Sequence, residues 1–308
     1  MVDIKLYAAP MEGITTYLWR QVHRELFGGA EKYYTPFISP NGNFTFQHRE
    51  LEEISREEEE LVPQLLANRG EYFVWAGKEL AARGFREVNL NLGCPSATVV
   101  AKHKGSGMFS DLASLERTLD ETFNGLPNMN ISVKTRVGRY STEEWPAILE
   151  LYNRYPISEL TVHPRVQKEF YQGRAHRELF VYTREHTAIP LVYNGDVTDP
   201  SDEALGWGCP VMLGRGMVMD PALFRRIRGG APATRQELRE YHDRLLALYA
   251  QTFSGDVPVL HKMRLLWTYL GQSFAGSDRY LRAVYKAGNM TSYLSAARAI
   301  LENCPLLT

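Results

Sequence analysis

The sequence predicts an α/β protein in which a (β/α)8 TIM barrel is followed by a C-terminal all-helical domain. Eight short, β-rich apolar runs alternate with segments of helical spacing, which is typical of βαβ units and a parallel sheet. No glycine fingerprint repeats among the units, which favours a closed barrel over an open doubly wound sheet. Beyond the Gly/Pro-rich stretch 229–232 the spacing is helical to the end. We therefore expect a catalytic barrel over residues 1–232 and a helical domain over residues 233–308.

Short apolar runs define the expected strands, and several are apolar almost throughout, as in strands covered on both faces. The strands are Ile4–Ala9, Tyr33–Ile38, Leu61–Leu66, Glu87–Leu92, Asn130–Thr135, Glu159–His163, Ile189–Asn194 and Pro210–Gly214. The helices between them include Thr16–Phe27, Glu71–Arg83, Leu112–Phe123, Thr142–Tyr155 and Pro221–Arg228. The second unit gives the weakest pattern, because residues 41–60 are polar and are expected to be mostly loop.

Apolar stripes and a charge excess characterise the C-terminal segment. Leu238, Tyr241, Leu245, Leu248 and Tyr249 fit one helical stripe, and Leu265, Leu266, Tyr269 and Leu270 fit another. Residues 233–308 carry a net charge of +3 and residues 1–232 carry −4. Since the whole chain has a net charge of −1, any surface that binds a polyanion must be a local patch. Its candidates are Lys262, Arg264, Arg279, Arg282, Lys286 and Arg298, although such an excess is often only a solvated face.

Composition limits the class of protein. The three cysteines, Cys94, Cys209 and Cys304, are too few and too scattered for a disulfide framework or a zinc site, which fits a reducing cytosol. Residues 1–10 lack the apolar core of a signal peptide, and no apolar run approaches membrane-spanning length. We expect a cytoplasmic protein, a monomer, with no metal site and no membrane contact.

Polar and reactive side chains follow one expected strand after another. In a barrel the active site lies at the C-terminal ends of the strands and in the loops that follow them. Residues at these positions are Pro10, Met11, Gln64, Asn91, Cys94, Lys134, Arg136, His163, Arg165, Asn194, Asp196, Gly214 and Arg215. A barrel without catalytic function does not require such groups at successive strand ends, so their clustering favours an active site.

The last two strand ends predict a phosphate site. Barrels often bind phosphate with the loops after strands seven and eight, where Asn194-Gly195-Asp196 and Gly214-Arg215-Gly216 lie. Glycine lets backbone N–H groups approach an anion, and Arg215 can add a charge-assisted hydrogen bond. Either turn alone is more simply explained by the backbone freedom of glycine. Together, at the two expected loops, they favour phosphate.

Lys134 and His163 end the fifth and sixth strands, above this phosphate site. A cation there could stabilise negative charge on an isoalloxazine ring. The structural alternatives are a lysine that extends from a strand end into water and a histidine bonded to a backbone carbonyl.

Cys94 gives the most specific signal. In Asn-Leu-Gly-Cys-Pro, Gly93 permits a sharp turn and Pro95 cannot extend the strand, so the thiol should face the barrel mouth. It could be a thiolate nucleophile beside His103 or Lys104, or a general acid that keeps its proton. The following basic segment, Ala101–Met108, is either a lid or a flexible, solvated loop, and the sequence alone favours the loop.

These motifs together resemble the dihydrouridine synthases, flavin-dependent enzymes that reduce specific uridines in tRNA. The resemblance runs nearly end to end through the barrel. It includes APMEGIT at 9–15, TPF at 35–37, PQLL at 63–66, NLNLGCP at 89–95, KGSG at 104–107, VKTRVG at 133–138, TVHPR at 161–165, KEFYQGRA at 168–175, YNGD at 193–196 and MLGRG at 212–216. NLNLGCP followed by VKTRVG and then YNGD is the most specific combination.

The resemblance implies a role for each matching residue. Pro10, Met11, Gln64, Lys134, His163, Asn194, Asp196, Gly214 and Arg215 would form an FMN site. Cys94 would protonate the uracil ring, while Asn91 holds substrate or flavin. Lys104, Arg136, Arg165, Lys168, Tyr171 and Arg174 would face the RNA. One departure is Pro164, where the family commonly has glycine between His and Arg. The helical domain would bind RNA.

The implied reaction is the NADPH-driven reduction of a uridine that has been extruded from the RNA fold. A flavin barrel acting on a free pyrimidine or a dihydroorotate-like molecule is the nearest alternative, although a small substrate needs no helical domain. The presence of Cys94 and Lys134 argues against an RNA-binding module that has lost catalysis. A third alternative is a flavin-free, phosphate-binding aldolase or isomerase, which a yellow colour of the purified protein would exclude. The sequence does not decide which uridine is reduced, whether the substrate is tRNA or ribosomal RNA, or whether NADPH or NADH is the electron donor.

Overall fold

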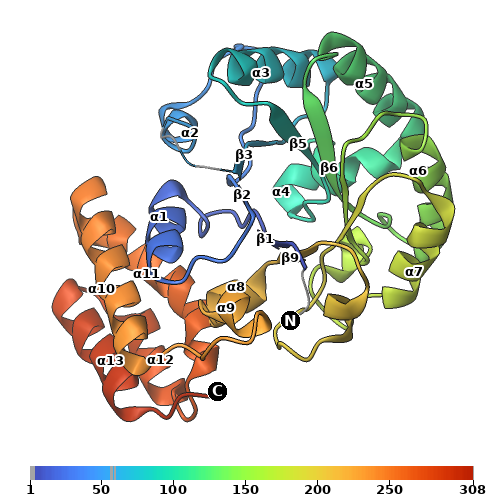
Figure 1. Ribbon diagram of the computed structural model, residues 1–308. Coiled ribbons are helices and arrows are strands. Elements are labelled where there is room, and N and C mark those ends of the chain that lie inside the picture. The colour runs from blue at the N-terminus through green and yellow to red at the C-terminus, as the bar shows by residue number, and fades with distance from the viewer. Residues whose placement is uncertain (1–3, 56–57, 59, 308) are drawn as a thin grey trace.

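A closed parallel barrel forms the body of the protein (Figure 1). The computed structural model describes residues 4–55, 58 and 60–307. Its nine short strands have the order β3-β2-β1-β9-β8-β7-β6-β5-β4, and only Pro63 separates β3 from β4, so the sheet closes on itself. The strands are β1 Leu6–Ala8, β2 Lys32–Tyr34, β3 Leu61–Val62, β4 Gln64–Leu65, β5 Glu87–Leu92, β6 Asn130–Arg136, β7 Leu160–His163, β8 Leu191–Tyr193 and β9 Val211–Leu213. The predicted TIM barrel is confirmed.

The structure corrects the prediction for two strands. The expected strand Leu61–Leu66 divides into β3 and β4, because Pro63 has no N–H to give to a neighbouring strand. The expected strand Tyr33–Ile38 ends at Tyr34, and Ile38 forms an isolated bridge with Leu65. Residues 41–60 are mostly loop among those described, as expected, and contain the short helix α2 His48–Glu52.

Helices cover the outside of the barrel (Figure 1). In α3, the fully buried residues Phe73, Ala76 and Leu80 recur at intervals of three and four, so one face of the helix packs on the strands. The barrel helices are α1 Tyr17–Leu26, α3 Gly70–Ala82, α4 Ala97–Val100, α5 Leu112–Gly125, α6 Trp145–Tyr152, α7 Arg177–His186, α8 Arg215–Met219 and α9 Leu223–Ile227. Short 3-10 helices lie at Gly105–Ser110, Thr142–Glu144, Gln167–Glu169 and Glu203–Gly206.

Four helices, α10 Arg235–Thr252, α11 Asp256–Leu270, α12 Asp278–Lys286 and α13 Met290–Asn303, form the predicted C-terminal helical part. Thr234 begins α10 with a capping box, in which its hydroxyl accepts from the N–H of Glu237 and the Glu237 carboxylate accepts from the N–H of Thr234. A 3-10 turn at Gly271–Ser273 follows α11. No helix within the described residues is long and apolar enough to cross a membrane.

Buried polar contacts join the helical part to the barrel, and one apolar core runs through both. Trp19 of α1 donates its indole N–H to the hydroxyl of Tyr241 on α10, at 2.5 Å, and both side chains are fully buried. The Ser273 hydroxyl donates to the carbonyl of Met219 at 2.5 Å. These contacts fix the helical part against α1 and α8, next to the barrel mouth.

The Tyr241→Phe substitution should lower the free energy of unfolding by about 1–3 kcal/mol, because it leaves the buried indole N–H of Trp19 without an acceptor. Urea denaturation measures the change. The control is Tyr285→Phe, which removes the hydroxyl of a tyrosine that is 42% exposed. Equal stability of the two variants would contradict this description of the contact.

Candidate active site

Two adjoining cavities open at the C-terminal ends of the strands. The larger has a volume of about 530 Å³, and its lining includes eight of the nine predicted cofactor residues: Pro10, Met11, Lys134, His163, Asn194, Asp196, Gly214 and Arg215. The ninth, Gln64, lines a smaller cavity of about 90 Å³ together with Asn91, Cys94 and Lys134. Lys134 therefore lies between the two, and the barrel brings the sequence-predicted groups together in one mouth.

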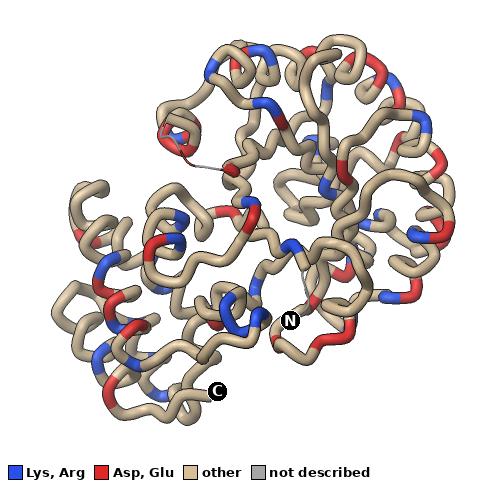
Figure 2. Tube along the Cα trace, viewed as in Figure 1, with Lys and Arg blue, Asp and Glu red and all other residues tan. Residues whose placement is uncertain are grey.

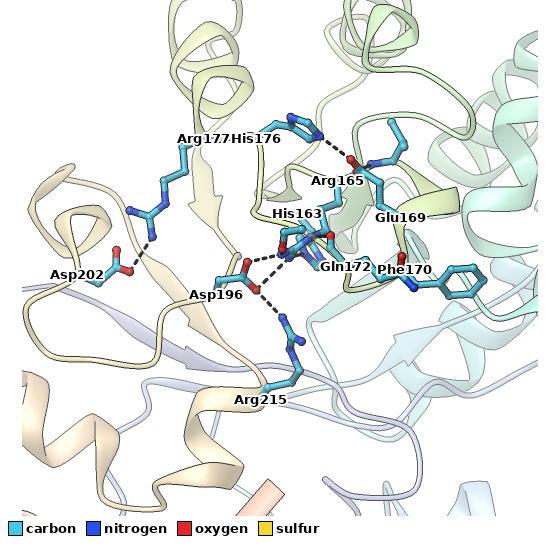
Figure 3. Close-up of polar contacts among 12 residues, drawn as sticks. His163, Arg165, Glu169, Phe170, Gln172, His176, Arg177, Asp196, Asp202 and Arg215 are labelled. Carbon is cyan, nitrogen blue, oxygen red and sulfur yellow. Dashed lines mark hydrogen bonds and ion pairs between the residues drawn. The ribbon is translucent and has the colours of Figure 1, made fainter. Parts of the chain in front are cut away.

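A partly buried ion cluster shapes one wall of the large cavity (Figure 3). Asp196 accepts from Nη1 and Nη2 of Arg165 and, at 2.5 Å, from Nη2 of Arg215. Burial alone would raise the pKa of the Asp196 carboxyl, but hydrogen bonds and charge from Arg165, together with the charge of Arg215, hold it below its ordinary value. The carboxylate thus stays ionised and orients both arginines.

Lys134 and His163 lack a carboxylate of this kind. Burial, assisted by the charge of Arg136, lowers the pKa of Lys134 to about 7. Burial and the neighbouring charges of Arg136 and Lys134 lower the pKa of His163 well below its ordinary value, so its ring is neutral. Since Arg165 can only donate, its 3.0 Å contact with His163 Nε2 puts the ring proton on Nδ1.

The loop that carries Cys94 is held from both sides. Asn91 Oδ1 accepts the backbone N–H groups of Gly93 and Cys94, at 3.1 and 2.9 Å. The carbonyl of Cys94 accepts from the N–H and the hydroxyl of Ser106. Gly105 lies in the left-handed region (φ 57°), and a Cβ atom there would lie 2.9 Å from the Cys94 carbonyl oxygen, so the site requires glycine.

The structure thereby corrects the expectation of a flexible, solvated loop at 101–108. Lys102 and His103 are exposed, but residues 105–109 form a buried 3-10 turn that supports Cys94. Lys104 is half-buried and donates to the Ser39 hydroxyl at 2.8 Å.

The protonation state of Cys94 separates its two possible chemistries. Burial raises the pKa of the Cys94 thiol above its ordinary value, despite the lowering influence of Arg136 and Lys134. The thiol is therefore protonated near neutral pH, which suits a general acid and not a thiolate nucleophile. Of the two bases considered for a thiolate, His103 is exposed and Lys104 is hydrogen-bonded to the Ser39 hydroxyl.

Three arginines predicted to face RNA are instead engaged within the protein. Arg136 and Arg165 are each 1% exposed. The Arg136 guanidinium donates to the carbonyls of Val166 and Phe170, and Arg165 is paired with Asp196. Arg264 donates to the carbonyl of Ala287. These arginines hold loops and a helix end in place. The predicted surface position is wrong for Arg136 and Arg165, whereas Arg264 is half-buried.

The other predicted RNA-facing residues are accessible or lie at the mouth. Lys168, Tyr171, Arg174, Arg279, Arg282 and Lys286 are exposed. Tyr171 lines the large cavity. The centroid of its ring lies 6.0 Å from the centroid of the His163 ring and 4.7 Å from the guanidinium carbon of Arg215. Lys262 donates to the carbonyl of Gly13 at 2.9 Å.

Sequence reasoning missed two residues of the helical part that line the large cavity, Tyr269 and Gln272. No motif marks them, and only the docking of α11 beside α8 brings them there. Glu12 follows the first expected strand, within the APMEGIT motif, but sequence reasoning assigned it no role; it lines the small cavity. The described residues contain no group of three or more His, Cys, Asp or Glu that could hold a metal ion.

Comparison with solved structures supports the barrel alone. The chain superimposes on the old yellow enzyme homologue NCR from Zymomonas mobilis with a TM-score of 0.51 and 13% identity, over 76% of this chain and 90% of that chain. A variant of the same protein gives a TM-score of 0.51 at 14% identity, over 77% of this chain and 90% of that chain.

Curated relatives match almost the whole chain. A probable tRNA-dihydrouridine synthase from Staphylococcus aureus (strain COL) is 28% identical over 311 residues, which cover 96% of this chain and 91% of the relative. The one from strain MRSA252 is 32% identical over 71% of this chain and 70% of the relative. Probable tRNA-dihydrouridine synthase 2 from Bacillus subtilis (strain 168) is 29% identical over the same shares. Residues 7–304 match the dihydrouridine synthase (Dus) family, and the chain therefore belongs to that family of enzymes.

Proposed function

We propose that this protein is an FMN-dependent tRNA-dihydrouridine synthase that reduces the C5=C6 bond of a uridine, with NADPH as the electron donor and Cys94 as the proton donor. The observation that carries the proposal is the protonated Cys94 thiol, which shares a small cavity with Lys134 next to a large, positively charged cavity. The names of the curated relatives support the same substrate.

The side chains of the large cavity suit an anionic cofactor. Lys134, Arg165 and Arg215 line it against one carboxylate, Asp196, so an anion there would balance the excess positive charge. Next to Gly214 there is also room, since an added Cβ would meet only the Cβ of Ala9, at 3.7 Å. Arg215 would hold the phosphate and Lys134 would lie at the ring. When bound, FMN would supply the hydride that adds to C6 of the uracil.

The small cavity offers hydrogen-bond donors to the substrate. Both lone pairs of Asn91 Oδ1 are used by Gly93 and Cys94, and one N–H of its amide is donated to Gln64, which leaves one N–H for a ligand. A uracil carbonyl can accept from it, whereas the amino group of cytosine cannot. Cys94 would then pass its proton to C5, so that hydride and proton together add two hydrogens across the C5=C6 bond.

Exposed basic residues on α12 support RNA as the substrate. Arg279, Arg282 and Lys286 recur at helical spacing and are exposed, and Figure 2 marks Lys and Arg along the helical part in blue. Together with Lys168, Tyr171 and Arg174 they would contact phosphates and unpaired bases around an extruded uridine. A role for residues 233–308 as the RNA-binding domain, a monomeric state and a cytoplasmic location belong to this proposal.

Replacing Cys94 with alanine should slow uridine reduction by about 10²- to 10⁴-fold, because the proton at C5 then has no positioned donor. Reduction of the bound flavin by NADPH should keep its wild-type rate. Stopped-flow absorbance measures the flavin step, and mass spectrometry of tRNA nucleosides measures dihydrouridine. Cys209→Ala is the matched control.

Unchanged uridine reduction in the Cys94→Ala protein would exclude Cys94 as the acid. The alternative function, reduction of a free pyrimidine, predicts that free uridine is turned over as well as tRNA in the same assay. Failure of the wild-type protein to produce dihydrouridine in tRNA would exclude the proposed function itself.

Replacing Arg282 and Lys286 together with glutamine should weaken tRNA binding and make it less sensitive to salt. Each lost phosphate contact should remove about 0.7–0.9 from the slope of log affinity against log salt. Filter binding at several salt concentrations measures the slope. The control carries Lys78→Gln and Arg117→Gln, two exposed cations on α3 and α5 with the same total charge change. Equal slopes for the two double variants would contradict the role of α12.

A further inference from the structure

A column of hydrogen-bonded side chains crosses the inside of the barrel from its floor to Cys94. On β5, Glu87, Asn89 and Asn91 recur at every second residue and therefore share one face of the strand, while Val88, Leu90 and Leu92 are buried on the other. The register pairs Asn89 with Gln64 on β4 and with Ser132 on β6, so these side chains lie side by side.

Each contact in the column runs in one direction. Asn91 Nδ2 donates to Gln64 Oε1 at 2.8 Å, and Gln64 Nε2 donates to Asn89 Oδ1 at 2.8 Å. Asn89 Nδ2 donates to Ser132 Oγ at 3.0 Å, and Ser132 Oγ donates to Glu87 Oε1 at 2.8 Å. Gln64, Asn89 and Ser132 are at most 1% exposed, so water cannot replace a lost partner.

Both ends of the column are fixed. At the mouth, the N–H groups of Gly93 and Cys94 can only donate, which forces Asn91 to turn its oxygen toward them. At the floor, the Glu87 carboxylate is paired with Lys32 at 2.9 Å and can only accept. No single amide between these ends can turn over without setting donor against donor at a neighbouring contact.

We propose that Glu87, Ser132 and Asn89 are positioning residues, which act from the barrel floor to fix the amide orientations of Gln64 and Asn91 and, through Asn91, the backbone of Cys94. None of the three lines the cavity that holds Cys94. The column explains why Asn91 presents a donor to the pocket and why the Cys94 loop is held in one place. The inference rests on the proposed function only for the role given to Cys94.

The reactivity of the Cys94 thiol tests this proposal without any measurement of catalysis. Ser132→Ala removes the acceptor of Asn89 and the donor to Glu87, so a buried mismatch should loosen the Cys94 loop. Alkylation of Cys94 by iodoacetamide in the flavin-loaded protein, followed by mass spectrometry with Cys209 as internal reference, should become faster by about 10-fold or more. Ser132→Thr keeps the hydroxyl and should restore a rate near that of the wild type.

Two further variants keep the test decisive. Glu87→Gln retains the shape of the side chain but adds N–H donors at the floor, and it should also accelerate alkylation of Cys94 and shift the flavin absorption spectrum. Thr122→Val removes an equally buried hydroxyl outside the column, one that donates to the Thr118 carbonyl, and should change neither. Wild-type reactivity of Cys94 in both Ser132→Ala and Glu87→Gln, or an equal increase in Thr122→Val, would overturn the proposal. Either result would leave the proposed function standing, since that is judged by dihydrouridine formation.

Discussion

Positive charge gathered at the barrel mouth is the constraint on which the site depends. Lys134, Arg165 and Arg215 line the large cavity with a single carboxylate, Asp196, and Arg136 lies close enough to influence Lys134, His163 and Cys94. Burial, and after it the like charges of neighbouring cations, lower the pKa values of Lys134 and His163. The fold tolerates the excess because the Asp196 carboxylate pairs with Arg165 and Arg215, and backbone carbonyls accept the hydrogen bonds of Arg136. A bound anionic ligand would compensate the remaining positive charge of the cavity.

The barrel also fixes the orientation of the polar side chains that surround these charges. Arg165 sets the tautomer of His163. The two backbone N–H groups of the Cys94 loop and the contact with Gln64 together set the orientation of Asn91. The same low-dielectric surroundings that weaken the lysine ammonium keep the Cys94 thiol protonated. The small cavity therefore holds a protonated thiol beside a lysine whose charge changes near neutral pH.

Sequence periodicity predicted the barrel, the helical part and most of the mouth, because strand ends in a barrel converge whatever the loops do. It could not predict the burial of Arg136 and Arg165, since the 166–173 loop folds back over their guanidinium groups. Tyr269 and Gln272 reach the cavity only through the docking of helices far away in sequence. The alternation of Glu87, Asn89 and Asn91 was visible in the sequence, but their partners depend on strand register.

The dependence of FMN affinity on pH tests the charge balance most directly. In the flavin-free protein Lys134 has a pKa of about 7, so above pH 7 a bound anion must draw a proton back onto it. The phosphate of FMN keeps its charge over this range. The dissociation constant should therefore rise between pH 7 and 9, approaching about 10-fold per pH unit, and this rise should disappear in Lys134→Met. An affinity independent of pH, or the same rise in the variant, would contradict the account.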